Sequence, residues 1–119
     1  MSSAKPPSYS PVRGASPGHV LLVDDDPAVL RGLTRTLRSL GYEVTPVADG
    51  GAAVAAIRKG GPFDAVLSDI TMPSMDGIQL LREIREHDLY VPVVLMTGEP
   101  AVSTAVKAVE YGAFHYLTK

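Results

Sequence analysis

Three consecutive aspartates, Asp24 to Asp26, follow an apolar run and precede a proline in the stretch HVLLVDDDP. Ionised carboxylates about 5 Å apart repel by roughly 3 kcal/mol per pair at an effective dielectric near 20, and by under about 1 kcal/mol in bulk water. The cluster therefore either lies in solvent or is neutralised by a cation. Because the chain offers oxygen ligands and no cysteine, the favoured cation is a hard one such as Mg²⁺.

Three other polar side chains end apolar runs later in the chain. Asp69 ends AVLSD, Thr97 ends VVLMT, and Lys119 follows YLT. An aspartate beside a metal ion can attack phosphorus, because the metal offsets the repulsion between the carboxylate and the phosphoryl oxygens. A lysine supplies positive charge for those oxygens, and a threonine supplies a hydroxyl donor. These residue types match phosphoryl transfer, in which positioning and charge neutralisation do most of the catalysis.

These residues can act together only if the fold brings them to one place. From His19 onward, short apolar runs alternate with segments of helical period, a pattern typical of βα units around a parallel sheet. The favoured architecture is α/β, a doubly wound parallel sheet of five strands in the order 2-1-3-4-5. Its strand ends share one rim, where the four stretches are expected to converge. The predicted strands are 19–24, 43–47, 65–69, 92–97 and 114–118.

Apolar residues at helical spacing predict helices between the strands. The first helix is expected to end at Gly41, and the fourth at Gly112. The second, more weakly patterned helix is predicted over 51–59, before the GGP at 60–62. The apolar stripes of the other three are Leu30, Leu33, Leu37 and Leu40; Ile78, Leu81 and Ile84; and Val102, Ala105, Val106 and Val109.

Composition limits the classes of function. The chain has 119 residues, 45 % hydrophobic and 20 % charged, which suits one globular domain. Its net charge of -2 gives no indication of binding to nucleic acid or to an acidic membrane surface. No apolar run approaches the roughly 20 residues of a membrane span. Residues 1–17 are rich in Ser and Pro and are predicted to be a disordered leader, with residues 18–119 forming the domain.

Four motifs together resemble one family. LLVDDDP, VLSDITMPSMDG, VLMTGE and YLTK occur in the order of the signature regions of response-regulator receiver domains of two-component signalling. Singly VDDD and TK are weak signals, but with the D-x-x-M-P-x-M-D-G loop they are highly specific. The resemblance covers residues 19–119 and implies a flavodoxin-like fold.

The resemblance implies a role for each acidic residue. Asp69 would be the phosphoacceptor and a ligand of Mg²⁺, Asp25 a direct ligand, and Asp24 a ligand through water. The backbone carbonyl of Thr71 would complete the protein's share of the metal site. Asp26, directly before a proline, is instead predicted to cap the first helix.

It also implies a switch. Thr97 and Lys119 would contact the acyl phosphate, and Tyr116 would be the aromatic residue whose rotamer follows Thr97. The expected donor is a sensor histidine kinase or a phosphotransfer protein in the cytoplasm. Phosphorylation would change partner binding or an output domain beyond residue 119, and the domain would catalyse only its own phosphorylation and dephosphorylation.

The chain departs from the family pattern at its end. Family members usually continue after this lysine with a proline and a fifth helix, which packs on the same face of the sheet as the first helix. The sequence stops at Lys119, so the domain is expected to be truncated after its fifth strand. Bare apolar surface would then favour self-association, and a homodimer is compatible with it.

Taken singly, each candidate residue has an ordinary structural explanation. Asp24 and Asp25 fit a solvated strand end. Thr97 before Gly98 fits a turn, and Asp76 in MDG is predicted to cap the third helix. The joint placement of the candidates favours phosphoryl transfer.

Two alternatives stay open. One is a protein-interaction module of the same fold that works without phosphorylation. The other is a phosphatase of the haloacid dehalogenase type, with Asp24 as the nucleophile and Asp26 as acid or base. That class usually has threonine or valine where this chain has Ala28, and no second acidic motif of that class follows.

Overall fold

The computed structural model describes residues 18–119, so the predicted leader, residues 1–17, lies outside the described part. Five strands alternate with four helices, and the predicted strands and the second helix are confirmed to within one residue at each end. The elements are β1 (His19–Val23), α1 (Pro27–Ser39), β2 (Glu43–Val47), α2 (Gly50–Arg58), β3 (Ala65–Asp69), α3 (Gly77–His87), β4 (Val93–Thr97), α4 (Val102–Glu110) and β5 (His115–Thr118).

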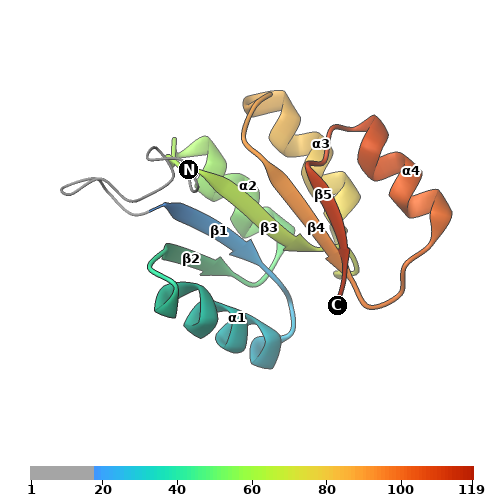
Figure 1. Ribbon diagram of the computed structural model, residues 1–119. Helices are drawn as coiled ribbons and strands as arrows, with labels where there is room; N and C mark the ends of the chain where they lie inside the picture. The colour runs from blue at the N-terminus through green and yellow to red at the C-terminus, as the bar shows by residue number, and fades with distance from the viewer. Residues whose placement is uncertain (1–17) are drawn as a thin grey trace, which may run out of the picture.

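The strands form one parallel sheet in the order β2-β1-β3-β4-β5, as predicted (Figure 1). β1 and β3 are neighbours, with Val23 opposite Ser68, so the residues that follow them leave the sheet side by side. β3 and β4 pair with Asp69 opposite Met96. Among the described residues, every helix is too short or too polar to cross a lipid bilayer.

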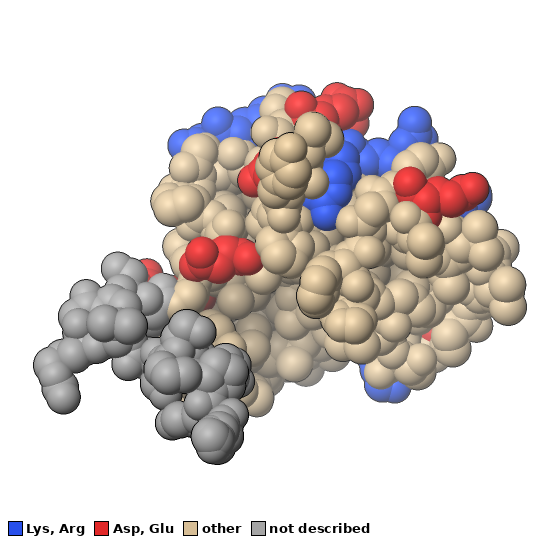
Figure 2. Space-filling model, turned by 45° about the horizontal axis from the view of Figure 1, so that its top comes forward, with Lys and Arg blue, Asp and Glu red and all other residues tan. Residues whose placement is uncertain are grey.

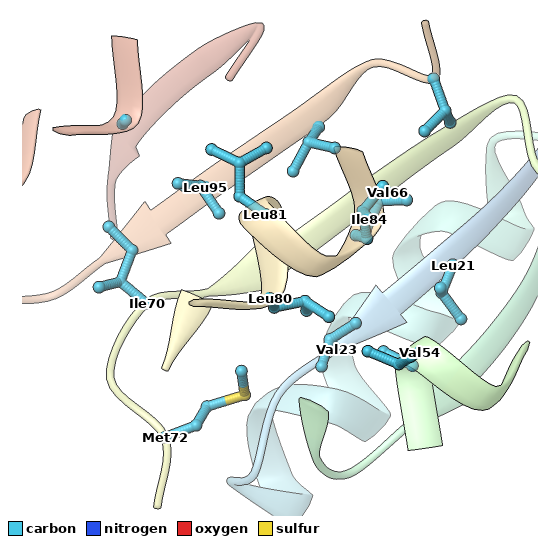
Figure 3. Packing of buried hydrophobic residues seen from close by; sticks show 14 residues of the cluster. Leu21, Val23, Val54, Val66, Ile70, Met72, Leu80, Leu81, Ile84 and Leu95 are labelled. Carbon is cyan, nitrogen blue, oxygen red and sulfur yellow. The ribbon is translucent and has the colours of Figure 1, made fainter. Parts of the chain in front are cut away.

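The main core lies on the face of the sheet that α2, α3 and α4 cover. Alternate strand residues point to this face, so Leu21 and Val23 of β1 join Leu95 of β4 there. Leu81 and Ile84 of α3 are fully buried against them. Figure 3 shows side chains of β1, β3 and β4 meeting those of α2 and α3.

The opposite face carries α1 alone among the described helices. Figure 1 shows α1 beside β2, at the edge of the sheet. The predicted stripe on this helix is therefore incompletely covered: Leu33 and Leu37 are half-buried, and Leu40 is 68 % exposed. Thr34 is the residue of α1 that is buried.

The predicted stripe of α4 is wrong as a core face. Val102 is 82 % exposed and Val109 75 %, whereas Ala108 is the buried residue of the helix. Helical period identified residues that share a side of α4, but the helix packs through a narrower side that holds Ala108. Its valines face solvent.

We expect Leu81→Ala to lower the free energy of unfolding by about 2–5 kcal/mol, because it leaves a cavity under α3. Val109→Ala on α4 is the control and should change it by about 0.5 kcal/mol or less. Urea unfolding followed by circular dichroism measures both. Equal losses in the two variants would contradict this assignment of core and surface.

Candidate functional site

Three carboxylates gather at the carboxyl ends of β1 and β3. Asp24 is fully buried, Asp69 is 6 % exposed, and Asp25 is exposed. One oxygen from each lies within 4.8 Å of the others, an arrangement that could hold a metal ion. The structure thus brings together the acidic residues of two separate motifs.

Lys119 joins the same cluster from the far edge of the sheet. Its Nζ lies 3.0 Å from Asp24 Oδ2 and 3.0 Å from Asp69 Oδ1. The backbone N–H of Lys119 donates to the carbonyl of Thr97 at 2.8 Å, which extends the β4–β5 pairing up to the site. One ammonium therefore compensates two buried carboxylates, and the pair with Asp24 was not foreseen from the sequence.

The second oxygen of Asp24 supports the backbone. Asp24 Oδ1 accepts the N–H of Asp26 at 2.9 Å. Asp26 in turn accepts the N–H of Ala28 at 2.9 Å and of Val29 at 3.4 Å, so its predicted role as the cap of α1 is confirmed. The three aspartates have three distinct environments.

Burial and the neighbouring ammonium of Lys119 have opposite effects on the pKa of Asp69. The pKa of Asp69 lies above its ordinary value, because burial disfavours the carboxylate more than the hydrogen bond and charge of Lys119 favour it. Asp24 and Asp25 raise it further by repulsion. The pKa of Lys119 is also raised: burial alone would lower it, but the hydrogen bonds and charges of the two carboxylates outweigh burial.

Thr97 and Tyr116 lie on the neighbouring strands β4 and β5. Thr97 is buried, and its Oγ1 accepts the backbone N–H of Glu99 at 3.0 Å. The Tyr116 hydroxyl accepts the N–H of Ala101 at 3.2 Å, just before α4, which has no side-chain cap of its own. Sequence reasoning missed this contact, because no local pattern links residues on different elements.

The loop after β3 is held by a close approach at Gly77. A Cβ on Gly77 would lie 2.6 Å from the carbonyl oxygen of Asp69 and 2.8 Å from the Cα of Ile70. The N–H of Gly77 donates to the carbonyl of Ile70 at 2.7 Å. Asp76 completes a capping box with Gln79, which confirms its predicted role. Thr71, exposed, begins this loop.

The donor set fits a hard divalent cation. The cluster offers oxygen atoms alone, two from buried carboxylates and one from the exposed Asp25. Three carboxylates against one ammonium leave negative charge uncompensated, which a divalent ion would balance.

Comparison with known proteins places this geometry in context. The family described as response regulator receiver domain matches residues 20–119. The transcriptional regulatory protein TrcR of Mycobacterium tuberculosis is 39 % identical over 104 residues, and GlrR of Escherichia coli 41 % over 103 residues. The match covers 87 % of this chain in both cases, but only 40 % of TrcR and 23 % of GlrR.

Solved structures share the fold. A CheY-like receiver domain protein of Methanospirillum hungatei superposes with a TM-score of 0.83 at 32 % identity, covering 87 % of this chain and 82 % of that one. TrrA of Thermotoga maritima, solved in complex with Mg²⁺-BeF, gives a TM-score of 0.78 at 27 % identity, covering 86 % of both chains.

We predict that Gly77→Ala lowers the free energy of unfolding by about 1–3 kcal/mol, because its Cβ forces the start of α3 away from β3. Gly32→Ala is the matched control: its Cβ meets nothing within 4 Å on α1, and alanine favours the helix, so stability should rise. Thermal unfolding distinguishes them. A neutral Gly77→Ala would show that the close approach relaxes freely.

The raised pKa of Asp69 predicts a pH-dependent stability. A folded pKa above the unfolded value means that this carboxyl's contribution is complete below about pH 3.9 and is lost as pH rises through the folded pKa. In metal-free buffer, Asp69→Asn should therefore gain stability over the wild type as pH rises from 4 through that pKa.

Chemical unfolding at several pH values measures this difference. Glu86→Gln, at an exposed position of α3, makes the matched change from carboxyl to amide away from the site and is measured alongside as the control. A difference for Asp69→Asn that is constant with pH, or that shrinks as pH rises, would show that the pKa is not raised.

Proposed function

The chain belongs to the response regulator receiver domain family, and from this premise we propose that Asp69 accepts a phosphoryl group from a histidine kinase or a phosphotransfer protein. The observation that supports it best is the sharing of the Lys119 ammonium between Asp69 and the buried Asp24, each at 3.0 Å. Such an ammonium can follow the negative charge from the carboxylate to an incoming phosphoryl group.

The proposed metal site uses Asp25 as a direct ligand, Asp24 through water, Asp69 and the carbonyl of Thr71. Mg²⁺, when bound, would supply the positive charge that offsets repulsion between the Asp69 carboxylate and the phosphoryl oxygens. The oxygen-only donor set and its uncompensated negative charge support this assignment.

In the proposed step, a carboxylate oxygen of Asp69 forms a bond to phosphorus as the bond from phosphorus to the donor histidine nitrogen breaks. The product is an acyl phosphate, and the electron pair of the broken bond stays on the histidine nitrogen. Lys119 donates to one phosphoryl oxygen. The Thr97 hydroxyl donates a hydrogen bond to a second phosphoryl oxygen. Its proton is free for this, because the hydrogen bond from the backbone N–H of Glu99 occupies only a lone pair of the Thr97 oxygen.

The proposed readout runs through Tyr116. Movement of Thr97 toward the phosphoryl group would open space for this ring and remove its hydroxyl from the N–H of Ala101 at the start of α4. The exposed side of α4 carries Val102 and Val109, and Figure 2 shows a largely uncharged area where Figure 1 places α4 and β5. We propose this surface as the contact for a partner, an output domain or a second copy.

The proposal makes this a signalling module, located in the cytoplasm, that catalyses only its own phosphorylation and dephosphorylation. The dehalogenase-type phosphatase has less support. Its acid or base would be Asp26, whose side chain is engaged as the cap of α1.

Incubation with acetyl phosphate and Mg²⁺, followed by intact-mass measurement, tests the proposal. We expect the mass of one phosphoryl group to be added, with loss of labelling in Asp69→Asn and at least about tenfold slower labelling without Mg²⁺. Asp88→Asn, at the end of α3, should label like the wild type.

Labelling that persists in Asp69→Asn would identify another acceptor. Absence of labelling in a folded wild-type protein that binds Mg²⁺ would favour the phosphorylation-independent interaction module.

A further inference from the structure

A groove of about 500 Å³ lies between α1 and β2. The groove shares no lining residue with the carboxylate cluster, which consists of Asp24, Asp25, Asp69 and Lys119. Its lining is Leu30, Arg31, Thr34, Arg35, Arg38 and Pro46.

The charged side chains that line the groove are all positive. Arg31, Arg35 and Arg38 are spaced by four and three residues, so they share one side of α1. The helix contains no acidic residue, although the chain as a whole has a net charge of -2. Among the described residues, both ion pairs are made by Lys119, so none of these guanidinium groups has a carboxylate within 4.0 Å.

Its floor combines apolar surface with an unsatisfied hydroxyl. Leu30 and Pro46 supply the apolar part, and Thr34 is only 8 % exposed. The Thr34 Oγ1 has no hydrogen-bond partner among the described residues. Arg38 is held at the edge because it donates to the carbonyl of Val44 at 3.2 Å.

We propose that this groove binds an acidic segment of a partner protein. Carboxylates of the segment would pair with Arg31 and Arg35, and an apolar side chain between them would pack on Leu30 and Pro46. Recognition would run through side chains. β2 is an edge strand, but Pro46 has no N–H to pair with an added strand.

Charge argues against the chain's own leader as the occupant. Residues 1–17 contain Lys5 and Arg13 and no acidic residue, so they would be repelled by the arginines. The inference does not depend on phosphorylation of Asp69, and its test uses the unphosphorylated protein.

The test is binding of a fluorescent synthetic peptide that repeats Glu-Glu-Leu, measured by anisotropy and located by amide NMR shifts. We expect shifts on α1 and β2, and binding at least about tenfold weaker in Arg31→Gln/Arg35→Gln. Lys59→Gln/Lys107→Gln has the same net charge change, at the end of α2 and on α4, and should bind within about twofold of the wild type.

The proposal would be overturned by equal weakening in the two double variants, by shifts located outside α1 and β2, or by equal binding of a Gln-Gln-Leu repeat. Inorganic phosphate is the remaining comparison: the same shifts at similar concentration would reduce the groove to a general anion site and would also reject the proposal. Circular dichroism confirms that the variants are folded.

Discussion

A single ammonium shared by two buried carboxylates is the interaction on which the site depends. Asp24 directly follows β1 and Asp69 is the last residue of the neighbouring β3, and burial disfavours both of their charges. Lys119 reaches them from β5, at the edge of the sheet, with 3.0 Å to each. The pairing therefore ties the ends of β1, β3 and β5 together, and the charge of the site depends on the position of the last strand.

This arrangement leaves the site incompletely neutralised. The pKa of Asp69 is raised by burial despite the ammonium beside it, and Asp25 adds a third carboxylate at the surface. Because its negative charge is only partly compensated, the site would be stabilised by any added positive charge. The hydrogen bond from Ala101 to Tyr116 links β5 to the start of α4, so a change at the site has a short physical route to that helix.

The two faces of the sheet are covered unequally, and this explains why the predicted apolar stripe of α1 is incompletely buried. α2, α3 and α4 enclose the main core on one face, while α1 lies beside β1 and β2 on the other. The leucines of α1 are consequently half-buried or exposed, and Thr34 is buried. On α4, which packs on the core face through Ala108, the valine stripe lies on the side of the helix that faces solvent. A repeat of apolar residues identifies a side of a helix, not whether another element covers that side.

By itself, the sequence determined the five strands, their order, the convergence of Asp24, Asp69 and Lys119, and the family. Alternating apolar runs encode βα units, and parallel strands leave few arrangements of their carboxyl ends. Only the tertiary structure decided that Lys119 pairs with Asp24 as well as Asp69, that Tyr116 accepts from Ala101, and that three arginines border one groove. Such contacts join residues far apart in sequence, and they depend on sheet twist, helix placement and rotamers, which local pattern does not encode.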